Sequence, residues 1–270
     1  MKLHPYRHST AAIATKHLKE QIIAPQFAQL EIALQVAPVD TDLLGTFTGE
    51  IERVGTPKEV ALRKARLGMQ ATGLPYGIAS EGSIGPDPMV PFLSSDIECL
   101  VWVDDLLGIE IVEFHRSMEI VAAHAVIDSG FDLEGFLKKA DFPNHGLIVK
   151  SKERITKGIT NRADLEKALA DNAISIESDL RSQFSPSRQK NIAAVSQKLV
   201  GRLAVLCHQC QTPGFGVVGN LYGLECMECK NFVERAVRGK VLGCAKCDYK
   251  EQIKNERRFV QPADCDYCNP

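Results

Sequence analysis

The sequence lacks a long apolar run. No stretch approaches the roughly 18 apolar residues that a membrane-spanning helix needs. The apolar stretch before Lys16 is too short for the core of a signal peptide. We therefore expect a cytoplasmic protein without membrane contact. In a reducing cytosol, cysteine thiolates bind metal rather than form lasting disulfides.

The sequence also lacks an excess of charge of either sign. Its formal net charge is −2, with 24% charged and 44% hydrophobic residues, which is an ordinary composition for a soluble globular protein. This balance excludes a strong non-specific attraction to nucleic acid or to anionic membranes. A chain of 270 residues is long enough for one large domain and one small one.

The signatures of the commonest hydrolases are missing as well. There is no P-loop, no G-x-S-x-G elbow and no H-E-x-x-H helix, so the best-known nucleotide, ester and zinc-protease chemistries are not indicated. The sequence has no low-complexity segment, and its internal repeat is a set of cysteine pairs.

Eight of the nine cysteines form C-x-x-C pairs in the last quarter of the chain. A tight turn over two intervening residues directs both sulfurs at one ion, and two such turns complete a tetrahedron with Zn–S distances of about 2.3 Å. We predict two structural zinc ions without an open coordination position for catalysis. Cys99 lies in an apolar stretch and is expected in the core. The predicted ligands are Cys207, Cys210, Cys226, Cys229, Cys244, Cys247, Cys265 and Cys268.

Four cysteine pairs can be combined into two sites in three ways. Joining pairs that are neighbours in sequence gives spacers of ordinary length for zinc sites, and we favour this sequential pairing. A nested pairing would join the middle two pairs and the outer two. Disulfides, an iron site and a redox dithiol are the alternatives to zinc.

The segments between the cysteines suggest hairpins. "FGVVGNLYGL" predicts two strands around a Gly-Asn turn, and "YKEQIKNERRFV" a second pair around Lys254-Asn255. We therefore predict a small all-β zinc-ribbon module at residues 207–270, which depends on metal for much of its folding free energy. Four thiolates give each zinc site a net charge of −2, so the module is negative. Contact with a protein partner is favoured over nucleic acid, although Arg257-Arg258 could contact phosphate locally.

Residues 1–206 alternate between strand-like and helix-like periodicity, which predicts an α/β domain with a mixed sheet and flanking helices. Thr56, Pro57 and Glu59 predict a capped helix start. A second helix starts at Pro186 and carries an apolar stripe up to Leu206. This helix runs straight into Cys207, so we expect the zinc module to be docked rigidly on the α/β domain.

Candidate functional residues lie where the predicted strands end. Thr15, Lys16 and Lys19 follow the first strand and could hold phosphate, although a solvated basic turn explains them equally well. Arg181 and Arg188 surround a helix start and form a second candidate anion site. The candidate carboxylates for Mg²⁺ or for activating water are Glu81, Glu59 and Glu50, and Glu59 has the alternative role of a capping residue.

Two stretches, "ATKHLKE" and "GTPKEVALRKARLGMQATGLPYGIASEGS", resemble the inosine/xanthosine triphosphate pyrophosphatase superfamily. The resemblance implies that Thr15 and Lys19 lie in a triphosphate-binding turn, that Glu59 is associated with metal and that Glu81 is the catalytic acid. It departs at Lys16, where asparagine is expected. Over nearly its full length the chain is similar to a bacterial family known as a domain of unknown function, through "ATKHLKE", "GTFTGE", "ASEGS", "SDLRSQFSPSR" and the C-terminal C-x-x-C pairs.

Two functions follow from these patterns. The first is a Mg²⁺-dependent phosphohydrolase, such as a nucleotide pyrophosphohydrolase, acting on a nucleotide or another phosphorylated small molecule. The alternative is a non-catalytic protein that binds a ligand in the α/β domain and a protein partner through the zinc module. Nucleic-acid binding ranks below both.

Overall fold

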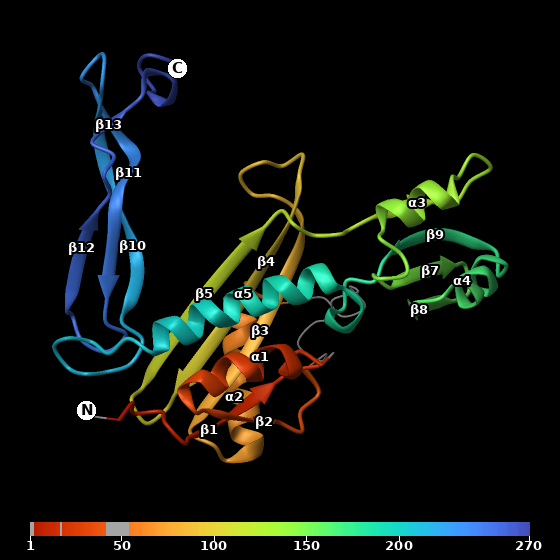
Figure 1. Ribbon diagram of the computed structural model, residues 1–270, viewed down its shortest axis with the longest axis horizontal. Helices are drawn as coiled ribbons and strands as arrows, with labels where there is room; N and C mark the ends of the chain where they lie inside the picture. The colour runs from red at the N-terminus through yellow and green to blue at the C-terminus, as the bar shows by residue number, and fades with distance from the viewer. Residues whose placement is uncertain (1–2, 17, 42–53) are drawn as a thin grey trace. The chain divides into compact units, whose positions relative to one another are not determined.

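The computed structural model describes residues 3–16, 18–41 and 54–270 (Figure 1). The chain divides into two compact units. The first consists of Met1–Leu106 and Glu110–Val200, and the second of Leu107–Ile109 and Gly201–Pro270. Glu50 lies outside the described residues. In the described part of the chain, no helix combines the length and the apolar character needed to cross a bilayer.

A five-stranded mixed sheet forms the centre of the first unit. Its strand order is β2-β1-β3-β4-β5, with β1 parallel to both β2 and β3, and β4 antiparallel to β3. The mixed sheet confirms the α/β class expected from the alternating periodicity. The strands are β1 (Thr10–Ala14), β2 (Ala33–Val36), β3 (Tyr76–Pro86), β4 (Ser94–Asp104) and β5 (Ile109–Ser117).

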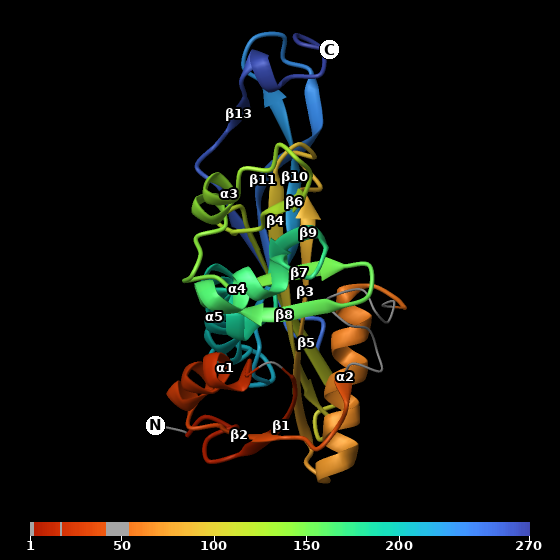
Figure 2. The same ribbon diagram turned by 90° about the vertical axis from the view of Figure 1, so that its right-hand side faces the viewer.

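Helices cover both faces of this sheet. Viewed along its edge, the sheet separates α1 and α5 on one side from α2 on the other (Figure 2). At the start of α2 the predicted capping box is confirmed, because Thr56 accepts from the Glu59 amide and the Glu59 carboxylate accepts from the Thr56 amide. The helices are α1 (Glu20–Phe27), α2 (Pro57–Thr72) and α5 (Pro186–Leu203), and the described residues include 3-10 turns at Ala28–Leu30, Ser182–Phe184 and Pro262–Asp264.

The two faces of the sheet are packed differently. On one face Trp102 is fully buried among aromatic rings, stacked on Tyr76 and Phe27 and tilted against Tyr6. On the α2 face the core consists mainly of small residues, and a Cβ at Gly77 would lie 2.6 Å from Met69. The small side chains therefore let α2 approach the sheet closely.

The first unit contains a second sheet that the sequence analysis did not separate from the first. It is antiparallel with strand order β6-β9-β7-β8, and its core includes apolar residues of both α3 and α4. Its elements are β6 (His124–Val126), α3 (Leu133–Lys139), β7 (Leu147–Ser151), β8 (Ile155–Ile159), α4 (Arg162–Leu169) and β9 (Ala173–Ser178).

The second unit is an all-β ribbon with strand order β12-β11-β10-β13. Two details differ from the sequence analysis. Gly219-Asn220 is not a turn, because it lies inside one long strand with an irregular register. Lys254-Asn255 is not the turn of a strand pair either, because β12 pairs with β11 whereas β13 pairs with β10. The strands are β10 (Gly216–Cys226), β11 (Phe232–Gly243), β12 (Lys250–Lys254) and β13 (Phe259–Val260).

Candidate metal centres and a buried charge cluster

The eight paired cysteines form two groups of four in the second unit. Within each group the sulfur atoms all lie within 4.8 Å of one another. The first group, which we call centre A, contains Cys207, Cys210, Cys244 and Cys247, and the second, centre B, contains Cys226, Cys229, Cys265 and Cys268.

The sulfur geometry of both centres fits a tetrahedral metal ion. Two sulfur pairs in centre A are 3.5 and 3.7 Å apart, and two in centre B are 3.7 and 3.8 Å apart. A tetrahedron with Zn–S distances of about 2.3 Å has edges of about 3.8 Å. A disulfide would need about 2.05 Å, and all these cysteines are free thiols. Each group could therefore hold one metal ion, consistent with zinc.

The pairing of the cysteines is crossed, so the favoured sequential pairing is wrong. Centre A joins the first and third C-x-x-C pairs, and centre B the second and fourth. The reason is the length of β10, whose 11 residues separate the first two pairs. A strand rises about 3.3 Å per residue, so these pairs are on the order of 30 Å apart and cannot share an ion. β11 runs back along β10 and returns the chain to the first pair.

The turns of centre A also direct backbone groups at sulfur. The amides of Lys246 and Cys247 donate to the Cys244 sulfur at 3.3 and 3.4 Å. The Thr212 hydroxyl lies 3.2 Å from the Cys210 sulfur. Such neighbours stabilise thiolate charge, which is the form that binds metal.

In the first unit, a buried charge cluster lies where β3 and β4 extend beyond the carboxyl end of β1. The last register pair of β1 and β3 is Ala14 with Ala79, so Ser80 and the residues after it continue past the parallel strands. The crossover from β1 to β2 contains α1, and the crossover from β2 to β3 contains α2. These two helices cover opposite faces of the sheet (Figure 2). Ligands of open α/β sheets bind at such a switch point. The cluster consists of Lys19, Lys64, Ser80, Glu81, Glu98 and Arg188, all 9% exposed or less.

The register of β3 and β4 divides this cluster between the two faces. Gly82 pairs with Glu98, and on this face Arg188 of α5 binds Glu98 at 2.6 Å. The Lys19 ammonium donates to the Ser80 hydroxyl at 3.1 Å. Neighbouring side chains of a strand point to opposite faces, and Glu81 accordingly forms an ion pair with Lys64 of α2.

Gly82 makes room for the Arg188–Glu98 pair. A Cβ at this position would lie 2.5 Å from both Arg188 Nη2 and Glu98 Oε1. Arg188 is further held by donating from Nη1 to the Leu180 carbonyl at 2.7 Å. A fully buried ion pair is costly to break, because one charge would remain uncompensated.

Lys19 differs electrostatically from the other cations of the cluster. Burial of the ammonium, reinforced by the nearby Arg188 charge, lowers the pKa of Lys19 to about 8, against the opposing effect of Glu98 and Glu81. Within residues 3–16, 18–41 and 54–270, the side chain of Lys19 has no ion pair, and its one hydrogen bond goes to Ser80. An anion beside Lys19 would stabilise its charged form.

Beside the cluster, Asp96 and Asn191 form a fully buried polar pair at 2.8 Å. Burial of the carboxyl and the neighbouring Glu98 charge raise the pKa of Asp96 to about 7. In the part of the chain that the structure describes, one oxygen each of Asp96 and Glu98 accepts no hydrogen bond. Unsatisfied polar atoms in a buried location are characteristic of functional sites.

Three of the residues that the sequence analysis selected come together in this cluster, namely Lys19, Glu81 and Arg188. Their chemical roles stay predictions. Lys16 instead forms an ion pair with Asp40 at 2.6 Å. The Thr15 hydroxyl donates to the Lys16 carbonyl.

The two remaining candidates with described positions have other local partners. The carboxylate of Glu59 accepts from both the amide and the hydroxyl of Thr56 and thus completes the capping box. Arg181 binds Asp179 through two nitrogens and lies over the ring of Phe184. It also lines a separate cavity of about 340 Å³ between the two sheets of the first unit.

Sequence reasoning missed Lys64, Glu98 and Asp96, although each left a signal. Lys64 lies on the apolar stripe of α2, next to buried Ala61 and Ala65. Asp96 and Glu98 share the alternating positions that continue as buried Leu100 and Trp102 along β4. Charged residues at core positions of a strand or helix indicate a paired or functional group.

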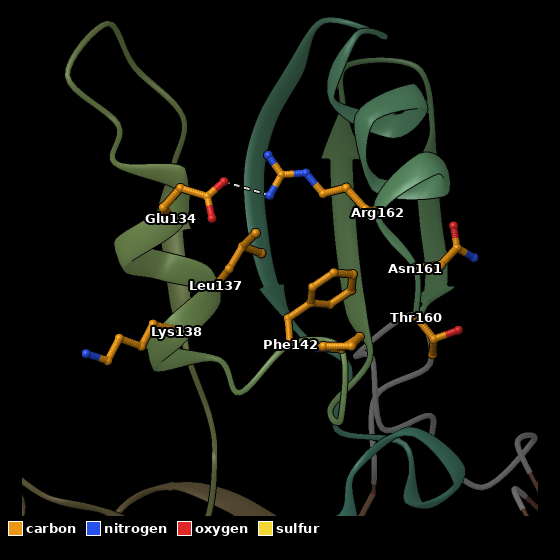
Figure 3. A pocket seen from close by; sticks show the side chains of 8 residues that line it. Glu134, Leu137, Lys138, Phe142, Thr160, Asn161 and Arg162 are labelled. Carbon is orange, nitrogen blue, oxygen red and sulfur yellow. Dashed lines mark hydrogen bonds and ion pairs between the residues drawn. The ribbon is translucent and has the colours of Figure 1, made fainter.

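A further pocket of about 510 Å³ lies between α3 and α4. Figure 3 shows Glu134 and Arg162 facing each other across one side of it, joined at 2.7 Å, while Lys138 points away. None of the site residues expected from the sequence lines this pocket. Its exposed ion pair and mixed lining identify no ligand class.

Comparison with known proteins gives one family match. Residues 64–270 match the model of a family described as a domain of unknown function, DUF6671. The matched region includes Lys64, Glu81, Glu98, Arg188 and all eight paired cysteines, whereas Lys19 precedes it. No curated protein matches the chain.

Proposed function

We propose, from the premise that this chain belongs to the DUF6671 family, that its first unit hydrolyses a phosphorylated small molecule at the buried charge cluster. We further propose that centres A and B hold two structural zinc ions. In both centres sulfur fills all four tetrahedral positions, which leaves no place for substrate. Catalysis is therefore assigned to the charge cluster.

The observation that carries the proposal is the environment of Lys19. The residue is 8% exposed, and its ammonium lacks an ion pair in the described residues. Arg188 and Lys64 place further positive charge nearby. An unpaired charge in a buried location is unfavourable, and a phosphate group would supply the missing counter-charge. The cluster also lies beyond the carboxyl end of β1, at the topological switch point of the sheet, where ligands of α/β sheets typically bind.

The carboxylates of the cluster supply the second part of the chemistry. Glu81 and Glu98 lie on opposite faces of the sheet, beside the edge of β3 that continues past the last residue paired with β1, and they are held by Lys64 and Arg188 respectively. We assign Glu81 to positioning the attacking water, and Glu98 to binding Mg²⁺ together with the substrate phosphates, because Mg²⁺ commonly uses one or two carboxylates. When bound, Mg²⁺ would neutralise charge on the transferred phosphate.

Nucleoside triphosphates are the first substrates to test. The reason is that short motifs within residues 10–115 resemble those of the inosine/xanthosine triphosphate pyrophosphatases. Lys19 and Glu81, two residues that this resemblance singled out, lie in one cluster. The panel should also contain sugar phosphates and pyrophosphate, because the buried cations select phosphate rather than a base.

Turnover by the zinc-loaded full chain tests the proposal. We expect Mg²⁺-dependent release of phosphate or pyrophosphate from at least one member of the panel. Glu81→Gln should lower kcat by about 100-fold or more, which is the usual contribution of general acid–base catalysis. Glu153→Gln, a matched change at an exposed position of the same unit, should leave kcat unchanged. Circular dichroism would confirm that both variants fold.

Proton uptake gives a second readout. Because pairing with an anion stabilises the ammonium, pyrophosphate binding should raise the pKa of Lys19 from about 8. At pH 8.5, calorimetry in buffers of different ionisation enthalpy should show uptake of a fraction of a proton. Lys19→Met should abolish it. Binding without turnover would leave a ligand-binding protein, and unchanged turnover in Glu81→Gln would remove Glu81 from the mechanism.

A further inference from the structure

A basic pocket lies on the second unit, and none of the eight paired cysteines lines it. It has a volume of about 490 Å³. Four of the residues that line it are basic and one is acidic, although the whole ribbon is close to neutral before its thiolates are counted. The lining residues are Gly223, Leu224, Arg238, Lys254, Asn255, Glu256, Arg257 and Arg258.

Most of the positive charge in this pocket is not neutralised within the ribbon. Arg257 binds Asp264 at 2.9 Å. Among the residues that the structure describes, the side chains of Arg238, Lys254 and Arg258 form no ion pair and all three are exposed. At physiological salt, screening limits the range of the electrostatic field of an exposed charge to about 8 Å. A ligand in the pocket therefore interacts mainly with these cations.

Two exposed phenylalanines lie next to residues that line this pocket. Glu225 of β10 pairs with Phe232 on one side and with Phe259 on the other, so the three side chains form a row on one face of the sheet. Phe232 is 54% exposed and Phe259 is 44% exposed. A Cβ at Gly223, which lines the pocket, would lie 2.2 Å from the Phe232 ring, and Phe259 directly follows Arg258.

We propose that this basic pocket binds the backbone phosphates of single-stranded nucleic acid, with bases stacked on Phe232 and Phe259. Cations that follow the backbone next to exposed aromatic rings are the two elements of single-strand recognition. Glu225 lies between the rings and disfavours a phosphate there, which places the phosphates at the cations and the bases at the rings. The flat rings favour this partner over an acidic protein segment, which would use the cations alone.

Fluorescence anisotropy of labelled 12-nucleotide DNA and RNA strands with the zinc-loaded full chain tests this proposal. With about four phosphate contacts, log K should fall with log salt at a slope of roughly −3. Replacing Arg238, Lys254 and Arg258 together by alanine should reduce the slope to about −1 and weaken binding at least tenfold in low salt. Phe259→Ala should weaken binding about tenfold with an unchanged salt slope.

A matched control removes the same charge elsewhere. The triple variant Lys139→Ala, Lys152→Ala, Lys167→Ala changes three exposed lysines of the first unit and should bind like the wild type. If the two triple variants lost equal affinity for nucleic acid, the effect would come from the net charge of the protein and not from the pocket, and the proposal would be overturned. It would be overturned equally by the absence of salt-dependent binding, or by tighter binding of a labelled 12-residue polyglutamate than of either nucleic acid. Unchanged zinc content in all variants shows that the ribbon is intact.

Discussion

The two units differ in what holds each of them together. The first has a conventional apolar core, in which Trp102 packs among other aromatic rings and α2 packs on small residues. The principal buried cluster described in the second consists of five residues, and two of these, Cys226 and Cys265, are also members of centre B. We therefore expect this small sheet, with so little apolar interior, to depend on bound metal for its stability. On this expectation, one chain combines a unit stabilised by apolar burial with a unit stabilised by metal bound to cysteine sulfur.

Metal removal should produce the largest difference in stability between the two units. We expect exhaustive chelation under reducing conditions to unfold the second unit, because its thiolates lose their shared ions. Hydrogen exchange should then show loss of amide protection throughout β10 and β11 and unchanged protection in β3 and β4. The single tryptophan, buried in the first unit, should keep its fluorescence. Retained protection in β10 would refute the metal dependence.

Double cysteine variants test the crossed pairing. Cys210→Ser with Cys244→Ser alters centre A alone and should leave about one zinc per chain. Cys210→Ser with Cys229→Ser alters both centres and should leave none. Under the sequential pairing the two results would be exchanged, because Cys210 and Cys229 would then share a site. Metal analysis after dialysis distinguishes these outcomes, and the first variant pair serves as the control for the second.

The ribbon shows which features of a metal site its sequence reveals. The ligands are recognisable because two sulfurs separated by two residues form a local unit. Their pairing depends on where strands end, and Gly219-Asn220 is equally suited to a turn and to an irregularity within a strand. In the structure, the register of β10 shifts beside Gly219 and the strand continues to Cys226. The crossed pairing follows from that continuation.

The residues of the charge cluster in the first unit could also be identified from the sequence only in part. Lys19, Glu81 and Arg188 could be selected from sequence because they lie near the ends of expected elements. The alternation along β4 marks Glu98 as a charge at a core position, but its partner cannot be read from the sequence, because this depends on the register that places Glu98 opposite Gly82 and next to Arg188. The separate sheet of β6 to β9 was missed for the same reason, since strand periodicity does not identify pairing partners.

Asp96 should make the first unit sensitive to pH. Its pKa is raised to about 7 in the folded chain, whereas an unfolded aspartate has a pKa of about 3.9. Between these values the folded state holds a proton that the unfolded state has released. The Asp96 contribution to stability is therefore complete below about pH 4 and is lost as the pH rises through about 7, with a slope of up to about 1.4 kcal/mol per pH unit.

Asp96→Asn should remove this slope, because the amide can still accept from Asn191 but does not titrate. Urea unfolding followed by Trp102 fluorescence between pH 5 and pH 8, without added Mg²⁺, measures the effect in the first unit. A slope that survives in Asp96→Asn would assign the pH dependence to another group. Centres A and B should show the opposite trend, since metal binding requires deprotonated thiols and strengthens as pH rises.

The smallest of these effects concerns the start of α2. Thr56→Ala removes the hydroxyl that accepts from the Glu59 amide and should lower the free energy of unfolding of the first unit by about 1 kcal/mol. Thr56→Ser keeps the cap and should retain most of it. Because the cap belongs to the first unit, which has its own apolar core, zinc content and ribbon protection should not change. A loss of zinc in Thr56→Ala would show that the two units are coupled in stability, contrary to the separate origins assigned to them.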